Sequence, residues 1–259
     1  MNLKRGQITI FIIIALVVVA VISAVILYKR GLLPDIGGAK DINPDSFMES
    51  CLQKKIKEGI NILYDQGGNI NPVLYRKFQF TNETKPSNIS YLCYTQNYYV
   101  PCINQEPMLI QHTKSELKDY ISYDVRSCFD ELTSKLEKQK YVVDAKYNGF
   151  EIELDPNKVI TRIDAELILT KNEETSDKKG FAIFVNSKIY DLLVLVQEII
   201  SQEARFCNFE DLGFMILYPE FEIDKLRTGD STIIYTIGNR ETGEKIKFAV
   251  RSCVIPPGI

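Results

Sequence analysis

The sequence predicts an α+β domain that follows a single transmembrane helix, and three features of the chain support this prediction. An uncharged apolar run covers residues 8–27. Apolar residues then recur at helical spacing as far as about residue 140, and beyond that point their period changes toward two, which is typical of strands. The region after residue 45 is also long enough to bury a hydrophobic core of its own. We therefore expect helices packed on a mostly antiparallel sheet.

The apolar run has only Thr9 and Ser23 as polar members. Its length matches a hydrocarbon core of about 30 Å, and inside lipid the backbone must form its own hydrogen bonds, so we expect a helix. A cleaved secretory signal would have an apolar region of only about 7–15 residues and a small-residue exit site, and no such site precedes Tyr28. We therefore predict four parts: a cytoplasmic leader at 1–7, a transmembrane helix at 8–28, a stalk at 29–45 and an extracytoplasmic domain at 46–259.

The predicted orientation places the N-terminus in the cytoplasm and the domain outside. Basic residues do not decide it, because Lys4 and Arg5 precede the helix while Lys29 and Arg30 follow it. The even number of six cysteines and two glycosylation sequons suit an exterior domain better than an interior one. The competing hypothesis is a cytoplasmic domain with six buried thiols. Two prolines and three glycines in residues 31–45 predict a stalk that holds the domain away from the lipid bilayer.

The leader carries a short motif, Lys4-Arg5-Gly6-Gln7, directly before the apolar helix. It resembles the archaeal class III signal peptides and, more loosely, type IV prepilin-like leaders. That resemblance implies a leader peptidase that cuts between Gly6 and Gln7 and leaves the helix on the mature protein. Prepilin-like leaders usually have a glutamate early in the mature helix, where this chain has Phe11. Through its leader and the stretch SCLQ…QGGNI, the whole chain resembles mostly uncharacterised single-span membrane proteins of small-genome archaea.

The charge balance of the domain is mildly acidic. The chain has 31 Lys and Arg residues against 34 Asp and Glu, and four of the basic residues flank the apolar run. No dense basic patch remains, so we predict no nucleic-acid partner. The chain has no C-x-x-C pair, and His112 is its single histidine, which disfavours a zinc cluster. We predict no metal and no cofactor.

Two helices are predicted in the first half of the domain. The pattern S-x-x-E at residues 46–49 has the form of a capping box, and Gly67-Gly68 stops the helix that follows it. The pattern T-x-x-E at residues 113–116 opens the second helix in the same way. Their apolar stripes consist of Phe47, Cys51, Ile56, Ile60 and Leu63 in the first, and of Leu117, Ile121, Val125, Cys128, Phe129, Leu132 and Leu136 in the second.

Strands are predicted in the second half of the domain. Apolar residues alternate with charged ones over residues 159–169, which predicts a strand with one solvated face, and Asp155-Pro156-Asn157 predicts a turn before it. Helical spacing returns once, over residues 189–205. The remaining predicted strands are 149–154, a short one at 181–185, and a C-terminal hairpin of 232–237 and 245–251 around 239–243.

The six cysteines predict three disulfides. Cys51 pairs with Cys128 if the apolar faces of the two helices pack together, and Cys93 pairs with Cys102, which is close in the chain. Cys207 and Cys253 both end elements near the C-terminal hairpin. Six cysteines allow 15 pairings, so this connectivity is a hypothesis among many. The sequons Asn82-Glu83-Thr84 and Asn88-Ile89-Ser90 lie in a Lys-Pro-Ser-rich segment and are candidate glycosylation sites.

Residues 91–102 are the richest segment in recognition chemistry, with tyrosines at Tyr91, Tyr94, Tyr98 and Tyr99. A disulfide between the two cysteines of the segment would make it a rigid aromatic loop, and tyrosine offers a large contact area with a polar tip. The alternative is that these tyrosines simply pack in the core and at the edge of a sheet, as strand tyrosines often do. The sequence favours this second interpretation.

No catalytic motif is present. His112 stands before a helix without a neighbouring serine or cysteine, so we interpret it as an ordinary surface or capping histidine. Glu151 and Glu153 share one face of a strand, as a glycosidase pair could, but solvated strand charges explain them as well. The same holds for Glu220 and Glu222. The sequence therefore names no reaction.

The predicted function is that of a membrane-anchored extracytoplasmic domain, a cell-surface binding or structural protein that works as a tethered monomer or small assembly. Its expected partners are the lipid bilayer, a leader peptidase, and another surface protein or a glycan. One alternative is a pilin-like filament subunit or minor pilin, which the leader supports and Phe11 does not. A second alternative is an anchored hydrolase without a recognisable motif.

Overall fold

The computed structural model describes residues 13–19, 21–22, 41–81 and 84–256. The chain divides into two compact units, Met1–Asp41 and Ile42–Ile259. In the first unit the described residues are helical, apart from Asp41 at its end. The predicted leader at 1–7, most of the predicted span at 8–28 and most of the predicted stalk at 29–45 lie outside the described residues. Among the residues that the structure does describe, no helix is both long enough and apolar enough to cross a membrane.

The second unit starts at Ile42, and its first helix is α2 (Pro44–Asp65). Asn43 caps this helix, because its side-chain oxygen accepts a hydrogen bond from the Ser46 backbone N–H at 3.0 Å, and Pro44 occupies the first turn. The predicted capping box at 46–49 is therefore wrong. Ser46 lies inside the first turn, since Asn43 followed by proline provides an earlier start.

The end of α2 agrees with the prediction, and its apolar stripe agrees in part, because Ile56, Ile60 and Leu63 are buried whereas Phe47 and Cys51 are only half-buried. Gly67 and Gly68 follow the helix with φ angles of +66° and +85°, and the Gly68 N–H bonds back to the Leu63 carbonyl at 2.8 Å. The helix ends in this left-handed turn because glycine adopts a positive φ angle without strain. The buried residues of α2 are Met48, Leu52, Ile56, Gly59, Ile60, Leu63 and Tyr64.

Helix α3 (Leu109–Lys138) starts four residues before the predicted Thr113. No side chain caps it, and both Leu109 and Thr113 are fully buried, so packing rather than a cap determines where it begins. The predicted stripe is otherwise correct, and it packs on α2. The two helices approach closely at Gly59, where a Cβ atom would lie 2.7 Å from Leu117 Cδ1.

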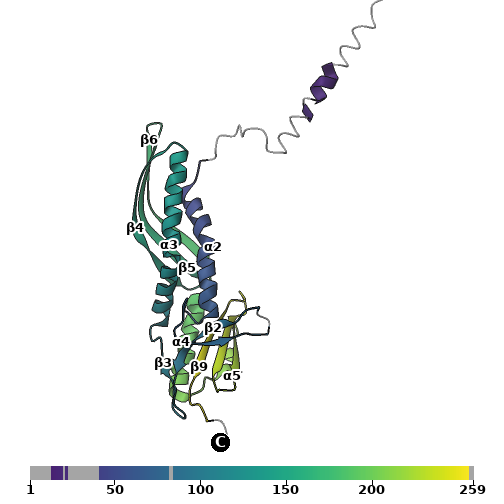
Figure 1. The fold of residues 1–259 in the computed structure, drawn as a ribbon, viewed down its shortest axis with the longest axis vertical. Helices are drawn as coiled ribbons and strands as arrows, with labels where there is room; N and C mark the ends of the chain where they lie inside the picture. The colour runs from purple at the N-terminus through teal and green to yellow at the C-terminus, as the bar shows by residue number, and fades with distance from the viewer. Residues whose placement is uncertain (1–12, 20, 23–40, 82–83, 257–259) are drawn as a thin grey trace, which may run out of the picture. The chain divides into compact units, whose positions relative to one another are not determined.

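A three-stranded antiparallel sheet packs against these helices (Figure 1). Its strands are β4 (Val142–Asp155), β5 (Lys158–Lys171) and β6 (Glu174–Asn186), which are longer than the predicted strands at 149–154, 159–169 and 181–185. The predicted turn at 155–157 joins β4 to β5, with Asn157 at φ +65°. The alternation in β5 is as predicted, because its apolar residues are mostly buried and its charged residues are exposed.

The second sheet has six strands in the order β1-β2-β9-β8-β7, with β3 beside β2. The strands are β1 (Tyr75–Phe78), β2 (Ser87–Tyr94), β3 (Ile103–Asn104), β7 (Phe221–Arg227), β8 (Ile233–Asn239) and β9 (Lys245–Arg251). The predicted C-terminal hairpin is β8 and β9, and its turn lies as expected. All pairs of these strands are antiparallel except β2 with β9, which no local pattern in the sequence indicates.

Helix α4 (Ile189–Phe206) covers one face of the six-stranded sheet and contacts β2, β8 and β9 (Figure 1). Tyr235 of β8 and Phe248 of β9 stack face to face beneath it, with ring centroids 5.1 Å apart. A short helix, α5 (Asp211–Leu217), follows and has no buried residue. The core runs without interruption from the α2–α3 pair through α4 to this inner face of the sheet. The fold class is thus α+β, as predicted.

The six cysteines form the three predicted disulfides, and none is free. Cys51–Cys128 joins α2 to α3, and Cys93–Cys102 closes the segment between β2 and β3. Cys207–Cys253 joins the end of α4 to the chain after β9. Each bridge therefore connects elements that the core already brings together.

Candidate functional site

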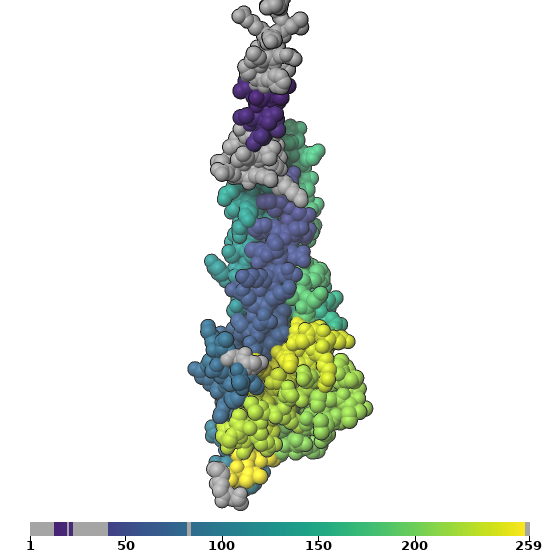
Figure 2. Space-filling model, turned by 90° about the vertical axis from the view of Figure 1, so that its right-hand side faces the viewer, coloured from purple at the N-terminus to yellow at the C-terminus, as the bar shows by residue number. Residues whose placement is uncertain are grey.

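We call the face of the six-stranded sheet that points away from α4 the outer sheet face. The end of α2 borders it, where Asp65 pairs with Lys247. Strand alternation places Asp224 of β7, Ile234 and Thr236 of β8, and Lys247 of β9 on it, because Ile223, Tyr235 and Phe248 point into the core. A small apolar cluster covers part of it: Ile89, Tyr91, Ile234 and Ala249, with Phe78, Phe80 and Tyr94 packed against them. Figure 2 shows this side of the unit, where β7 to β9, in green to yellow, lie beside α2, in blue.

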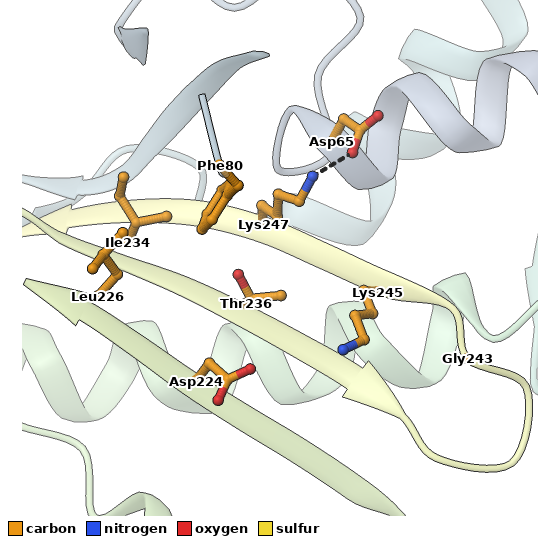
Figure 3. A pocket seen from close by; sticks show the side chains of 9 residues that line it. All are labelled: Asp65, Phe80, Asp224, Leu226, Ile234, Thr236, Gly243, Lys245 and Lys247. Carbon is orange, nitrogen blue, oxygen red and sulfur yellow. Dashed lines mark hydrogen bonds and ion pairs between the residues drawn. The ribbon is translucent and has the colours of Figure 1, made fainter. Parts of the chain in front are cut away.

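A groove of about 390 Å³ lies on the outer sheet face. Figure 3 shows its lining: Asp65 from the end of α2, Phe80 from the segment after β1, Asp224 and Leu226 from β7, Ile234 and Thr236 from β8, Gly243 from the β8–β9 turn, and Lys245 and Lys247 from β9. These side chains come from several separate segments of the chain. Only the assembled sheet brings them together.

The register of the strands arranges the polar groups of the groove in a row. Asp224 lies directly opposite Thr236, and Thr236 lies directly opposite Lys247. Directly opposed residues on one face of an antiparallel pair have Cβ atoms about 4.5–5.5 Å apart. A carboxylate, a hydroxyl and an ammonium group therefore follow one another at short, regular intervals.

Ion pairs hold both lysines of the groove. Lys247 Nζ lies 2.8 Å from Asp65 Oδ1 and 5.4 Å from the centroid of the Phe80 ring, and Lys245 Nζ lies 3.2 Å from Glu222 Oε2. The Asp224 carboxylate and the Thr236 hydroxyl have no hydrogen-bond or ion-pair partner among the described residues. The groove thus contains two cations held by ion pairs, beside an acceptor and a hydroxyl that are available to a ligand.

The structure divides the four predicted recognition tyrosines into two pairs. Tyr91 and Tyr94 pack against the outer sheet face with ring centroids 5.0 Å apart, and the Tyr91 hydroxyl bonds to Thr232 at 3.0 Å. For these two the packing interpretation is correct. Tyr98 and Tyr99 lie beyond the strand and are 46% and 59% exposed, so they are the pair that a partner can reach.

The C-terminal segment holds the loop that carries these exposed tyrosines. The backbone N–H of Tyr99 donates to the Val254 carbonyl at 3.0 Å, and the Cys253 N–H donates to the Val100 carbonyl at 2.9 Å. The Arg251 guanidinium donates to the Thr95 carbonyl and stands 5.8 Å from the Tyr98 ring centroid. Tyr99 itself has a φ of +61°, which is unusual for a residue other than glycine. Two disulfides and these bonds therefore fix the loop before any partner arrives.

A second hollow of about 590 Å³ lies at the start of α4, where bonds within the chain hold the Glu244 and Ser187 side chains. The Glu244 carboxylate accepts from the Lys188 backbone N–H at 2.8 Å. Ser187 accepts from the Ile189 N–H at 3.2 Å and bonds to the Tyr64 hydroxyl at 2.8 Å. These bonds explain where the helix starts.

Beneath the sheet, on its inner face, lies a buried carboxyl group. Glu203 of α4 is fully buried, and the Tyr235 hydroxyl donates to it. Burial raises the pKa of Glu203, which the hydrogen bond from Tyr235 opposes, and burial also raises the pKa of Tyr235. Because Glu203 lies on the opposite side of the sheet from the groove, this pair is part of the core.

Ion pairs with basic side chains hold Glu151, Glu153 and Glu222 of the candidate catalytic pairs. Glu151 bonds to Lys118 and Glu153 bonds to Arg162, each at 2.8 Å, and these hydrogen bonds lower the pKa of both carboxyl groups. A glycosidase needs one carboxylic acid with a raised pKa, so this geometry fits solvated strand charges. Glu222 pairs with Lys245 beside the groove.

His112 lies in the first turn of α3, and its Nε2 atom is 2.8 Å from Asn69 Oδ1. This contact joins the helix to the loop after α2, which agrees with a structural histidine. Among the described residues, no group of His, Cys, Asp and Glu side chains could hold a metal ion.

The two sequons and the leader motif are placed only in part. Asn88 lies in strand β2 opposite Lys77, rather than in the loop that the sequence predicts. Asn82 lies outside the described residues, as do Gly6 and Gln7 of the leader. Ser90, the third residue of the second sequon, is buried and donates to the Gln66 carbonyl.

Sequence reasoning missed the groove residues Phe80, Asp224, Thr236, Lys245 and Lys247. The alternation of lysine with apolar residues in β9 was visible, and it could have indicated a strand whose lysines share one face. Nothing in the sequence shows that β7 and the end of α2 border that face. Comparisons of the chain with protein-family models, with curated proteins and with solved structures found no match.

Proposed function

We propose that this protein is a membrane-anchored domain that faces the cell exterior and binds a partner at the cell surface. The observation that carries the proposal is that all six cysteines are paired within one folded unit. Disulfides persist in oxidising compartments and are rare in the reducing cytosol. The apolar run at residues 8–27 supplies the anchor in this proposal, and its orientation follows from the location of the domain.

The binding role draws support from two surfaces of the folded unit. The groove on the outer sheet face offers polar groups without partners beside apolar side chains. The loop with Tyr98 and Tyr99 presents exposed aromatic rings on a fixed backbone, which lowers the entropy lost on binding. Neither surface contains a catalytic constellation among the described residues, so the proposal is a binding role.

The test is the state and the location of the native protein. Intact cells are treated with an external protease, and membrane extract is alkylated with a thiol reagent before and after reduction. We expect the protease to remove the domain from intact cells and all six cysteines to react only after reduction. Six reactive thiols without reductant, or a domain protected from the protease until the cells are lysed, would refute the exterior location.

Intact-mass measurement of the same extract tests the leader. We expect a mature chain that keeps the apolar segment and begins at Met1 or, after processing, at Gln7. A mature N-terminus beyond Leu27 contradicts the anchor. Electron microscopy of the surface fraction tests the pilin-like alternative. Filaments composed mainly of this chain would establish that alternative.

A further inference from the structure

We infer that the groove on the outer sheet face binds a neutral saccharide. The inference rests on the proposed function, since it names the ligand of a surface-binding domain. It depends on three properties of the groove, which are its mixed charge, its row of hydrogen-bonding groups and its apolar side. Each property is a feature of the described residues.

The charges of the lining favour neither anions nor cations. Asp65 and Asp224 carry negative charge, while Lys245 and Lys247 carry positive charge, and all four border the same groove. Ion pairs with Asp65 and Glu222 already offset the two lysines. Because the lining has no net charge that would select an ion, a neutral polar molecule is the ligand that fits it best.

The row Asp224–Thr236–Lys247 matches the chemistry of neighbouring hydroxyl groups. A carboxylate only accepts hydrogen bonds, an ammonium group only donates them, and the Thr236 hydroxyl does both. A sugar hydroxyl also does both, so adjacent hydroxyls can donate to Asp224 and accept from Thr236 or Lys247. Bonds to the charged members of the row are the stronger ones.

The rest of the lining suits the C–H face of a sugar ring. Leu226 and Ile234 lie opposite each other on β7 and β8, and Phe80 stands over the sheet beside them (Figure 3). Phe78 holds the Phe80 ring in place through an edge-on contact, with centroids 4.9 Å apart. A ligand with hydroxyls on its rim and C–H groups on its face would therefore meet polar and apolar partners at the same time.

The size of the groove is also suitable. Its volume of about 390 Å³ lies within the range in which small-molecule pockets occur. The groove is partly open to solvent, so a longer chain could continue beyond the bound unit. We therefore expect recognition of one or two sugar units within a larger glycan.

The experiment uses the full-length chain in lipid nanodiscs, because many common detergents carry sugar headgroups. Saturation-transfer NMR and calorimetry are recorded with methyl glucoside, methyl mannoside, methyl galactoside, maltose, cellobiose and diacetylchitobiose as neutral probes. Inorganic phosphate and spermidine serve as charged probes. We expect at least one neutral probe to bind with a dissociation constant on the order of 1 mM, and the charged probes to bind more weakly.

The variants are Thr236→Val, which removes one hydroxyl at nearly constant shape, and Asp224→Asn, which removes one charge. Thr236→Val should weaken saccharide binding about tenfold, because a polar group of the ligand loses its partner. Asp224→Asn should weaken binding about threefold or more, because its neutral amide oxygen accepts a weaker hydrogen bond than the carboxylate does. Asp144→Asn is the matched control, since Asp144 is also an exposed strand aspartate and lies on β4 of the other sheet. It should leave binding unchanged. Protease resistance of each variant shows whether it folds.

Three outcomes overturn the inference. One is that no neutral probe binds the wild-type chain at concentrations on the order of 50 mM. Another is that phosphate or spermidine binds more tightly than every saccharide. The third is that a saccharide binds equally well to the folded Thr236→Val and Asp224→Asn variants. None of these results depends on where the protein lies in the cell, so failure of the saccharide site and failure of the exterior location are distinguishable.

Discussion

The disulfide between α2 and α3 offers a test of what stabilises the folded unit. Cys51 and Cys128 are 77 residues apart in the chain, and their bridge ties together the two longest helices among the described residues. Replacing both by alanine removes the bridge and leaves the surrounding apolar contacts nearly unchanged, because each position loses only a sulfur atom. The main expected effect is therefore on the unfolded chain, which becomes free to explore more conformations.

The magnitude follows from the length of the loop that each bridge closes. If the unfolded chain behaves as a flexible polymer, closing a loop of 77 residues corresponds to about 4.5 kcal/mol of lost chain entropy at 25 °C. The Cys93–Cys102 bridge spans 9 residues, and the same relation gives about 2.6 kcal/mol. We expect Cys51→Ala/Cys128→Ala to lower the free energy of unfolding by about 2 kcal/mol more than Cys93→Ala/Cys102→Ala.

Pulse proteolysis in urea measures these free energies on the full-length chain in nanodiscs, because only the unfolded domain is cleaved during a short exposure to protease. The matched control for the long-loop variant is the short-loop variant, which also removes two buried or partly buried sulfur atoms. Reduced and alkylated wild type gives the limit with all three bridges open. A long-loop variant as stable as the wild type, or more stable than the short-loop variant, would refute the loop-entropy reasoning.

Three further predictions concern single side chains. Glu203→Gln should remove a decrease in the free energy of unfolding that the wild type shows as the pH rises. Above the normal glutamate pKa of 4.5, Glu203 of the unfolded chain loses its proton. In the folded chain burial raises the pKa of Glu203, so it keeps the proton until the pH passes that higher value. Gly68→Ala should lower the free energy of unfolding by about 1–3 kcal/mol, because φ is +85° and the new Cβ would lie 2.6 Å from Thr113 Oγ1. Gly213→Ala is the comparison variant. It should change the free energy of unfolding by nothing or raise it by up to about 1 kcal/mol, because Gly213 lies in helix α5, where alanine is preferred. Thr161→Val should stabilise the protein by about 1 kcal/mol, because the buried Thr161 hydroxyl has no hydrogen-bond partner among the described residues.

The same urea assay checks all three. For Glu203→Gln it is repeated between about pH 4 and pH 9, and a slope equal to that of the wild type would contradict the assignment. Equal effects of Gly68→Ala and Gly213→Ala would show that backbone conformation at Gly68 does not matter. A loss of stability in Thr161→Val would show that the hydroxyl has a partner, such as an ordered water molecule.

The predicted helix starts failed for a common reason. S-x-x-E and T-x-x-E describe a capping box, but the same letters also occur inside a helix, as at Ser46 and Thr113. In α2 the cap is Asn43, and in α3 burial of Leu109 extends the helix backward without a cap. The sequence also predicted β6 too short, because the first half of the strand carries charged residues and no alternation. That half is a strand because it pairs with β5.

The sequence by itself determined the features that depend on short-range periodicity. Apolar spacing predicted the buried stripes of α3 and α4 and the second half of the stripe of α2, and alternation predicted β5 and the C-terminal hairpin. Burial of one face imposes a period on the residues that form it. All three predicted disulfides were correct, because their cysteines lie on packed helix faces, near the ends of neighbouring elements, or close together in the chain.

Only the tertiary structure decided which distant segments share a surface. The parallel pairing of β2 with β9 joins residues that are about 160 positions apart, and no local property of either strand indicates it. That pairing separates Tyr91 and Tyr94, which pack on the sheet, from the exposed Tyr98 and Tyr99. The groove depends on the same long-range order, because a shift of one residue in the register of β8 would turn Thr236 into the core.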